Sequence, residues 1–230
     1  MRHITKKQEP GSLTMYRSQL FKQYPAPGAL PRTAWDDYKE KSEARLQLCE
    51  EQQYLCCFCM GPIKPTEKEM RIAHFLPQNP QPPTPAAYRG HVLDWRNLFG
   101  ACTGHEGDAH VEEHCDVRQK NLRLHARLNP CTYQRGTLLY DAKGSVGSND
   151  VDVLNDANEK LGLNIEYLKQ QRRDALLLFC ERSLPPKIKW DTKTLRKALE
   201  IYDGSGQGMV PPYCEVVRAY LEKKLASLSR

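Results

Sequence analysis

Four segments of the chain have the hydrophobic and polar spacing of helices. Residues 34–55 lack glycine and proline and are rich in Glu, Lys, Ala and Leu, which predicts one helix. Residues 155–181, 190–202 and 212–228 carry apolar residues at helical intervals. We expect these apolar faces to pack into a core, with a partner-binding face as the alternative.

The middle of the chain alternates short apolar stretches with loops. Residues 71–76 are a short apolar stretch, and the proline-rich residues 77–85 cannot form regular structure. A polar loop at 103–110 precedes a predicted short helix from about Glu112 to Ala126, and residues 137–140 have the composition of a strand. We expect this part to combine short strands with helices.

A segment rich in Gly, Ser and Asp at 143–152 separates the middle part from the helical C-terminal part. A chain of 230 residues can bury one core, or a compact motif with a helical extension. We divide it into an N-terminal helical segment (1–55), a middle domain (56–142) and a C-terminal helical region (150–230) that is a candidate for partner docking. The expected fold class is α+β, mostly helical.

Composition restricts the class of protein. No apolar run approaches the length of a membrane span, and the first ten residues lack the apolar stretch of a secretory signal, so we expect a cytoplasmic protein. The net charge of +6 and the pI near 8.8 are compatible with a polyanionic partner, but equally with an ordinary solvated surface.

The nine cysteines point to a metal rather than to disulfides, because a reducing compartment keeps thiols reduced and an odd number leaves one unpaired. Zinc takes four tetrahedral thiolate or imidazole ligands, and a CxxC turn presents two sulfurs to the same side of the ion. We predict a structural zinc ion held by four cysteines: Cys56, Cys59, Cys102 and Cys115. Two alternatives are Cys57 in place of Cys56, and buried thiols without a metal.

The other cysteines lack metal-ligand pairing and are interpreted as structural. They are Cys49, Cys131, Cys180 and Cys214. A closed site of four thiolates has no open position for a substrate, so any chemistry must come from other residues.

Three polar residues lie between the cysteines or beside them. His74 follows a short apolar stretch, Asn97 precedes Leu98 shortly before Cys102, and Asp116 follows Cys115 directly. This order of CxxC, His, Asn-Leu before Cys, and Cys-Asp at a helix start resembles the HNH, or ββα-metal, nuclease motif. The ordered set is more specific than any one of its residues.

Further segments sharpen the resemblance. The opening Met-Arg-His-Ile-Thr-Lys, the Cys56–Met60 cluster, His74–Gln78, Asp94–Leu98 and His114–Asp116 together resemble PtuB, the HNH component of Septu and retron-linked phage-defence systems. The resemblance spans roughly residues 1–130. It implies a ββα-metal fold with a four-cysteine zinc knuckle, a partner ATPase of the ABC type (PtuA-like), and in some systems a reverse transcriptase with its msDNA.

Each of the three residues has a chemical role in such a site. An imidazole suits the general base that deprotonates water, so we assign His74 to this role. A carboxylate at a helix start suits Mg²⁺ or Mn²⁺, so we assign Asp116 as a ligand of the catalytic metal. Asn97 would orient the loop that carries His74, or approach the metal. Taken singly, each also has a structural explanation, as a satisfied imidazole or a helix cap.

The chain departs from the pattern at Ala73, where many HNH enzymes have an acidic metal ligand. Either another residue supplies the ligand, or the site is weakened, or the residue is an engineered substitution. Candidates for a substitute lie in the loop before Cys115, and the first of them is His114. The others are His105, Asp108, His110, Glu112 and Glu113. The alternative for this loop is an ordinary polar surface.

The leading hypothesis is an endonuclease that hydrolyses phosphodiester bonds in DNA, or in RNA such as tRNA, as the effector of a phage-defence complex. Nothing in the chain resembles a base-reading motif, so we expect specificity to come from partners. A second hypothesis is a zinc-stabilised binding module for nucleic acid or protein without cleavage. A free-standing restriction-like enzyme is disfavoured, because no DNA-reading domain is present.

On sequence alone, Ala73→Glu is expected to raise metal-dependent cleavage, because it restores the acidic residue before the catalytic histidine. Nicking of a plasmid with Mg²⁺ or Mn²⁺ measures this. Unchanged or lower cleavage with intact zinc content would contradict the expectation.

Overall fold

The computed structural model describes residues 1–26, 30–31, 33–81, 91–183, 190–204 and 209–228. The helices are α1 (Gly11–Gln23), α2 (Lys41–Glu51), α3 (Cys115–Gln119), α4 (Val151–Asn155), α5 (Glu166–Ser183), α6 (Thr192–Asp203) and α7 (Cys214–Leu228). The strands are β1 (Arg71–His74), β2 (Leu98–Ala101), β3 (Leu139–Tyr140) and β4 (Val146–Gly147). Single turns of 3₁₀ helix lie at η2 (Trp95–Asn97) and η3 (Ala126–Leu128), and a π-helical turn lies at η4 (Asp156–Lys160).

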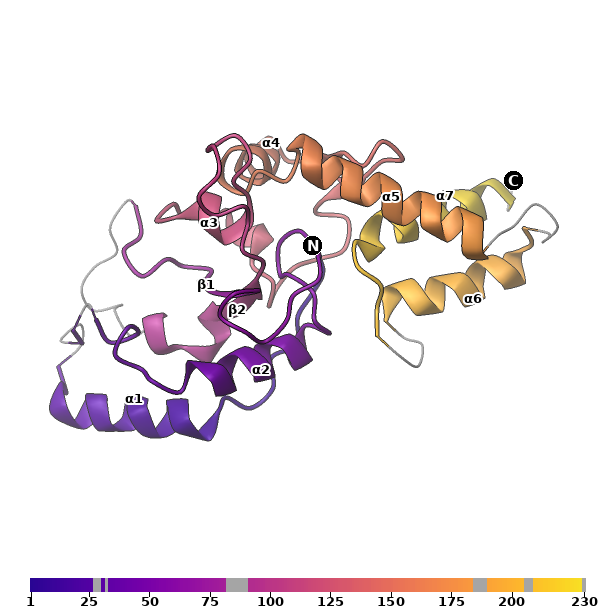
Figure 1. Ribbon diagram of the computed structural model, residues 1–230. Helices are drawn as coiled ribbons and strands as arrows, with labels where there is room; N and C mark the ends of the chain where they lie inside the picture. Colours follow the sequence, from indigo (N-terminus) through magenta and orange to yellow (C-terminus); the bar gives the residue numbers. More distant parts are fainter. Residues whose placement is uncertain (27–29, 32, 82–90, 184–189, 205–208, 229–230) are drawn as a thin grey trace.

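Two small antiparallel sheets accompany the helices, which confirms the α+β class. In the first sheet β1 pairs with β2, from Arg71 opposite Ala101 to His74 opposite Leu98. In the second, β3 pairs with β4. Helix α2 packs against β2, and the short α3 packs against β1 (Figure 1). The molecule is elongated, with α1 at one end and the pair α6 and α7 at the other (Figure 1).

The N-terminal segment is anchored to the first sheet through a buried lysine. The Lys6 ammonium lies 2.7 Å from a carboxylate oxygen of Glu51 and 4.0 Å from the ring centroid of Trp95, and it donates to the carbonyl of Leu98 over 2.9 Å. Burial lowers the pKa of Lys6, and the Glu51 carboxylate opposes that effect. The segment before α1 is therefore part of the fold around β2.

The helix predicted over residues 34–55 is shorter in the structure, where only Lys41–Glu51 is helical. Residues before it form turns, which place the Trp35 ring 5.1 Å from the His74 ring. After α2, Gln53 and Tyr54 have φ angles of 53° and 60°, a left-handed conformation that a helix cannot continue through. Tertiary packing and the turn into the cysteines therefore override the helical composition of these residues.

Two further predicted helices are also interrupted. The helix expected from Glu112 to Ala126 is limited to α3, because Lys120 has a φ angle of 50°. The helix expected over 155–181 is divided by η4 and by a non-helical stretch with Gly162 at a φ angle of 60°. The strand composition at 137–140 is realised as β3 alone.

The predicted helices at 190–202 and 212–228 correspond to α6 and α7. They pack with α5 around a second apolar cluster that includes Phe179, Leu195 and Leu221. The residue before α7, Tyr213, contacts the CxxC turn, because its backbone N–H donates to the Met60 carbonyl over 3.0 Å. The C-terminal helices are therefore connected directly to the cysteine region.

Two remaining expectations concern loops and membranes. Residues 77–81 of the proline-rich segment lack a helix or a ladder strand, and its residues 82–85 lie outside the described residues. Among the residues that the structure describes, none of the helices has the length and apolar character needed to cross a membrane.

Candidate metal centre and the adjoining polar cavity

The four predicted cysteines converge from three segments of the chain. Cys56 and Cys59 lie in the turn after α2, Cys102 directly follows β2, and Cys115 is the first residue of α3. Their sulfur atoms all lie within 4.8 Å of one another. Two of the distances, Cys56 to Cys115 and Cys59 to Cys102, are 3.8 Å.

These distances fit a tetrahedral zinc site. With Zn–S bonds of about 2.3 Å, the sulfurs of a tetrahedron are separated by roughly 3.8 Å. Disulfide sulfurs would instead lie about 2 Å apart, and all nine cysteines are free thiols. The four residues can therefore hold a zinc ion as thiolates, and their predicted grouping is confirmed. Burial disfavours ionisation of Cys56, but hydrogen bonds from the thiols of Cys102 and Cys115 bring its pKa well below its usual range.

Backbone hydrogen bonds and turns position both pairs of cysteines, Cys56 with Cys59 and Cys102 with Cys115. In the first half, the N–H of Cys56 donates to the Gly61 carbonyl over 2.8 Å, and the N–H of Gly61 points to the Cys59 sulfur at 3.3 Å. In the second, Gly104 has a φ angle of 58°, and the N–H of His114 donates to its carbonyl over 3.0 Å. A Cβ at Gly104 would lie 2.2 Å from the His114 carbonyl oxygen, so only glycine fits this turn.

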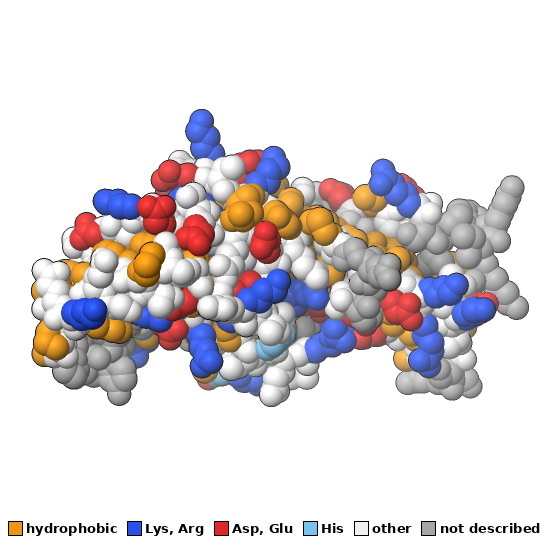
Figure 2. Space-filling model, turned by 90° about the horizontal axis from the view of Figure 1, so that it is seen from below, with side chains coloured by type: hydrophobic (Ala, Val, Ile, Leu, Met, Phe, Trp, Pro, Cys, Tyr) orange, Lys and Arg blue, Asp and Glu red, His pale blue; other side chains and the backbone are white. Residues whose placement is uncertain are grey.

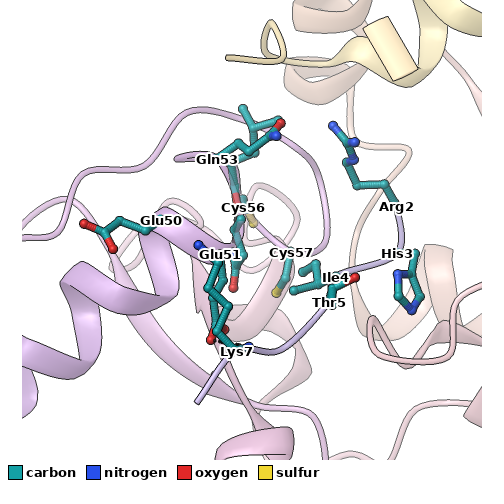
Figure 3. Close-up of a pocket in the computed structure, with 12 residues that line it drawn as sticks. Arg2, His3, Ile4, Thr5, Lys7, Glu50, Glu51, Gln53, Cys56 and Cys57 are labelled. Atoms are coloured by element: carbon teal, nitrogen blue, oxygen red, sulfur yellow. Dashed lines mark hydrogen bonds between the residues drawn. The ribbon is translucent and has the colours of Figure 1, made fainter. Parts of the chain in front are cut away.

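Cys57 lies outside the cluster, so the structure favours Cys56 over the alternative grouping that uses Cys57. Its backbone N–H donates to the Gly100 carbonyl over 3.0 Å, and burial raises the pKa of its thiol well above the usual range. Cys56 and Cys57 both line a cavity of about 320 Å³ between residues 2–7 and residues 50–57 (Figure 3). Among the described residues, the four cysteines interpreted as structural also belong to no metal-ligand group: Cys49, Cys131, Cys180 and Cys214.

A polar cavity of about 500 Å³ lies beside the first sheet and α3. It brings together two of the predicted catalytic residues, His74 and Asp116, although they are far apart in sequence. Its other charged lining residues are Asp36, Arg71, Glu106, Glu113 and Lys120. Carboxylates, cations and an imidazole therefore share one solvent-filled space.

His74 stands at the end of β1 with one ring nitrogen already used. Its Nε2 donates to the carbonyl of Val92 over 3.1 Å, and the ring packs edge-on against Trp35. Burial lowers the pKa of His74 to about 4, which the hydrogen bond to Val92 opposes. The imidazole is consequently neutral at neutral pH, and its Nδ1 is the nitrogen left to accept a proton.

The Asn97 side chain is bound to the loop after His74. Its Oδ1 accepts from the N–H of Leu76 over 2.7 Å, and its Nδ2 donates to the carbonyls of Leu76 and His91, each over 2.9 Å. Both amide protons are used, and Asn97 does not line the cavity. Of the two roles considered for this residue, the geometry favours orienting the loop over approaching a metal.

Asp116 is the carboxylate at the start of α3, and it is paired with an arginine. Its Oδ2 accepts from Nε of Arg71 over 2.9 Å, while Nη1 of Arg71 donates to Glu106 over 2.7 Å. Burial raises the pKa of Asp116, and the Arg71 guanidinium opposes this shift. Outside the four cysteines, the described residues contain no group of three His, Cys, Asp or Glu side chains placed as metal ligands.

The structure does not place His114 where a second ligand beside Asp116 is expected. His114 is buried, its Nδ1 donates to the Glu112 carbonyl over 3.2 Å, and its ring packs 4.9 Å from the His105 ring. It is absent from the cavity lining because its ring packs with His105 and Tyr167.

Of the candidate substitute ligands in the loop before Cys115, Glu113 lines the cavity. Sequence reasoning missed Glu106, although it lies in the same loop, and it missed Asp36. Asp36 lies within residues 34–55, which the sequence predicts to be helical, and no local pattern indicates that it lines the same cavity as His74.

Ala73 is completely buried in the main apolar core. A glutamate at this position would place a carboxylate among apolar side chains, where an unpaired charge costs several kcal/mol. The structure therefore does not favour the expectation that Ala73→Glu raises cleavage.

Comparisons with protein-family models, curated proteins and solved structures find no match to this chain. The function is therefore inferred from the chain's own residues.

Replacing one of the four clustered cysteines is expected to remove bound zinc and destabilise the fold, whereas replacing its neighbour Cys57 is not. We expect Cys56→Ser to reduce zinc from about one ion per chain to near zero. We expect it to lower stability by roughly 4 kcal/mol, or the unfolding midpoint by about 10 °C. Elemental analysis and calorimetry measure both, with Cys57→Ser as the matched control. Equal zinc loss in the two variants would contradict the assignment.

Burial should keep the His74 imidazole neutral in mildly acidic solution. Since its folded-state pKa of about 4 lies below the usual value of 6.5, protonation should occur only as the pH falls toward 4. The ¹⁵N chemical shifts of the ring, followed from pH 7.5 to 5 in zinc-loaded protein, report this. A titration midpoint near 6.5 would show that the ring is not buried as described.

Proposed function

We propose that the chain is a metal-dependent endonuclease of the HNH type that hydrolyses phosphodiester bonds in nucleic acid. The observation that carries the proposal is the meeting of His74 and Asp116 at one polar cavity, beside a four-cysteine cluster. A neutral, positioned imidazole and an adjacent carboxylate are the groups that metal-assisted hydrolysis requires.

The arrangement of elements supports this proposal. An antiparallel β1–β2 pair is followed in the chain by α3, which packs on β1, so the order is two strands and a helix. The Gln119 side chain of α3 donates to the Phe75 carbonyl over 3.0 Å, which ties the helix to the strand that bears His74. We interpret these elements as a ββα-metal motif, with the cysteine centre joining the end of β2 to the start of α3.

Three residues in and beside the cavity have distinct roles in the proposed hydrolysis. The hydrogen bond to Val92 leaves Nδ1 of His74 to accept a proton from the attacking water. Asp116 would hold the catalytic Mg²⁺ or Mn²⁺, and one or two carboxylates suffice because such an ion keeps several water ligands. When bound, the ion would neutralise charge on the phosphate and polarise it. Asn97 positions the loop after His74 through its three hydrogen bonds.

The biological setting of the proposal rests on the resemblance to PtuB. In this proposal, the nuclease works in the cytoplasm as the effector of an anti-phage complex with an ABC-type, PtuA-like ATPase, with or without a reverse transcriptase and msDNA. The substrate is DNA, or RNA such as tRNA. On the face in Figure 2, Lys and Arg side chains are interspersed with acidic ones rather than gathered into a basic patch. A basic patch is the usual mark of a protein that binds nucleic acid by itself, so this face fits a nuclease whose specificity comes from partners.

The C-terminal helices offer a surface for such a partner. Leu177 and Leu178 of α5 and Ile201 of α6 are exposed apolar residues outside the nuclease-like part. We include the region 150–230 in the proposal as the docking part of the chain.

A second candidate function is a zinc-stabilised binding module that does not cleave. The observation that favours it is the pairing of Asp116 with Arg71, together with the apolar residue at position 73. Metal-dependent cleavage that requires His74 distinguishes the two functions.

Removing the general base should abolish most of the cleavage. We expect His74→Ala to reduce the rate of Mg²⁺- or Mn²⁺-dependent nicking by about 10²–10⁴-fold, the usual contribution of general base catalysis. The assay uses plasmid DNA and a tRNA pool, with the chain alone and with its ATPase partner.

The control is His125→Asn, because an asparagine can replace this histidine as the cap of η3. Equal cleavage by His74→Ala and the control would contradict the role of His74 as general base. No metal-dependent cleavage by the unmodified protein on either substrate would favour the binding module.

A further inference from the structure

Arg71 bridges two carboxylates inside the cavity that holds His74. Its Nε binds Asp116 at 2.9 Å and its Nη1 binds Glu106 at 2.7 Å. The side chain is 39% exposed and lines the same cavity as His74, so solvent reaches it. A cation therefore already occupies the carboxylate that would hold the catalytic metal.

The guanidinium keeps donors available for a further acceptor. It has five N–H donors in a planar fork, and Asp116 and Glu106 accept from two of its three nitrogens. Within the described part of the chain, no hydrogen bond is made by its remaining nitrogen, Nη2. The fork matches the oxygen spacing of a phosphate group, which a lysine cannot match in the same way.

The charges around the cavity indicate how a bound metal ion or a phosphate would change the ion pairs of Arg71. Glu113 is already paired with Lys120 at 3.2 Å, whereas Asp116 and Glu106 share Arg71. A divalent cation at Asp116 would repel the guanidinium, because both are positively charged and would lie a short distance apart. A phosphodiester entering the same cavity would attract it.

We propose that Arg71 exchanges partners in this site. It binds Asp116 before a divalent cation is present, and it donates to a substrate phosphate once the cation has replaced it there. Arg71 thus weakens metal binding in the resting protein and holds the phosphodiester beside His74. This inference rests on the proposed nuclease function and adds a phosphate-binding residue to it.

The test measures metal affinity and nucleic-acid affinity separately from cleavage. Zinc-loaded Arg71→Ala and Arg71→Lys are compared with unmodified protein. Mn²⁺ binding is followed by the electron paramagnetic resonance signal of free Mn²⁺. Binding of a labelled 30-mer duplex DNA and of an RNA hairpin is measured at several salt concentrations with Mn²⁺ present, so that the cation holds Asp116. Every protein in this assay carries His74→Ala, so that the nucleic acid is not cleaved.

For Arg71→Ala we expect Mn²⁺ to bind at least about threefold more tightly, because the competing cation is gone. Nucleic acid should bind about tenfold more weakly, since one charge-assisted contact is lost, and the salt dependence should fall by about one unit of slope. Arg71→Lys should keep Mn²⁺ affinity close to that of the unmodified protein, because the charge remains. It should bind nucleic acid less tightly, because the fork is lost.

Arg173→Lys is the matched control, because Arg173 also pairs with a carboxylate, Glu166, but lies on α5 outside the cavity. Its affinities should equal those of the unmodified protein.

Unchanged Mn²⁺ affinity in Arg71→Ala, or unchanged nucleic-acid affinity in both variants, would overturn the exchange. If Arg71→Ala fails to fold, Arg71→Lys decides the phosphate contact by itself. Absence of cleavage in the unmodified protein contradicts the nuclease function, whereas the two affinities judge Arg71 independently of it.

Discussion

Four cysteine sulfurs from three chain segments lie close enough together to hold a zinc ion, and the rest of the site depends on this grouping. The regular structure beside these cysteines is short, since β1 and β2 are four residues each and α3 is five. A domain with such short elements gains little from its own ladders and helical turns. A metal joined to all three segments would supply the missing constraint, because binding to a folded site contributes directly to folding.

The same constraint positions the chemical groups. Cys102 immediately follows β2, whose Leu98 lies opposite His74, and Cys115 immediately precedes Asp116. Fixing these two cysteines therefore fixes the distance between the strand with the imidazole and the helix with the carboxylate. Asn97 and Gln119 refine the arrangement through hydrogen bonds to the loop that leaves β1. In the proposed function, a structural metal thus orients a site in which a different metal assists hydrolysis.

Sequence reasoning succeeded where the chemistry is local and failed where it is long-range. The CxxC turn and the two later cysteines have few alternative uses in a chain of this kind, so the grouping was predictable, as were the helices α6 and α7. The ends of α2 and α3 were not, because they depend on left-handed residues such as Gln53 and Lys120, which are not glycines. The pairing of Arg71 with Asp116 joins residues 45 positions apart and has no local pattern. It is nevertheless the contact that most alters the chemistry expected at the cavity.

The most direct test of the account is X-ray absorption at the zinc edge, on protein purified under reducing conditions. We expect about one zinc ion per chain with four sulfur neighbours at about 2.3 Å. Loss of that signal in Cys56→Ser, but not in Cys57→Ser, would show that Cys56 supplies a zinc ligand and that Cys57 does not. Absence of stoichiometric zinc, or a first shell with nitrogen or oxygen in place of one sulfur, would contradict the centre on which the site is built.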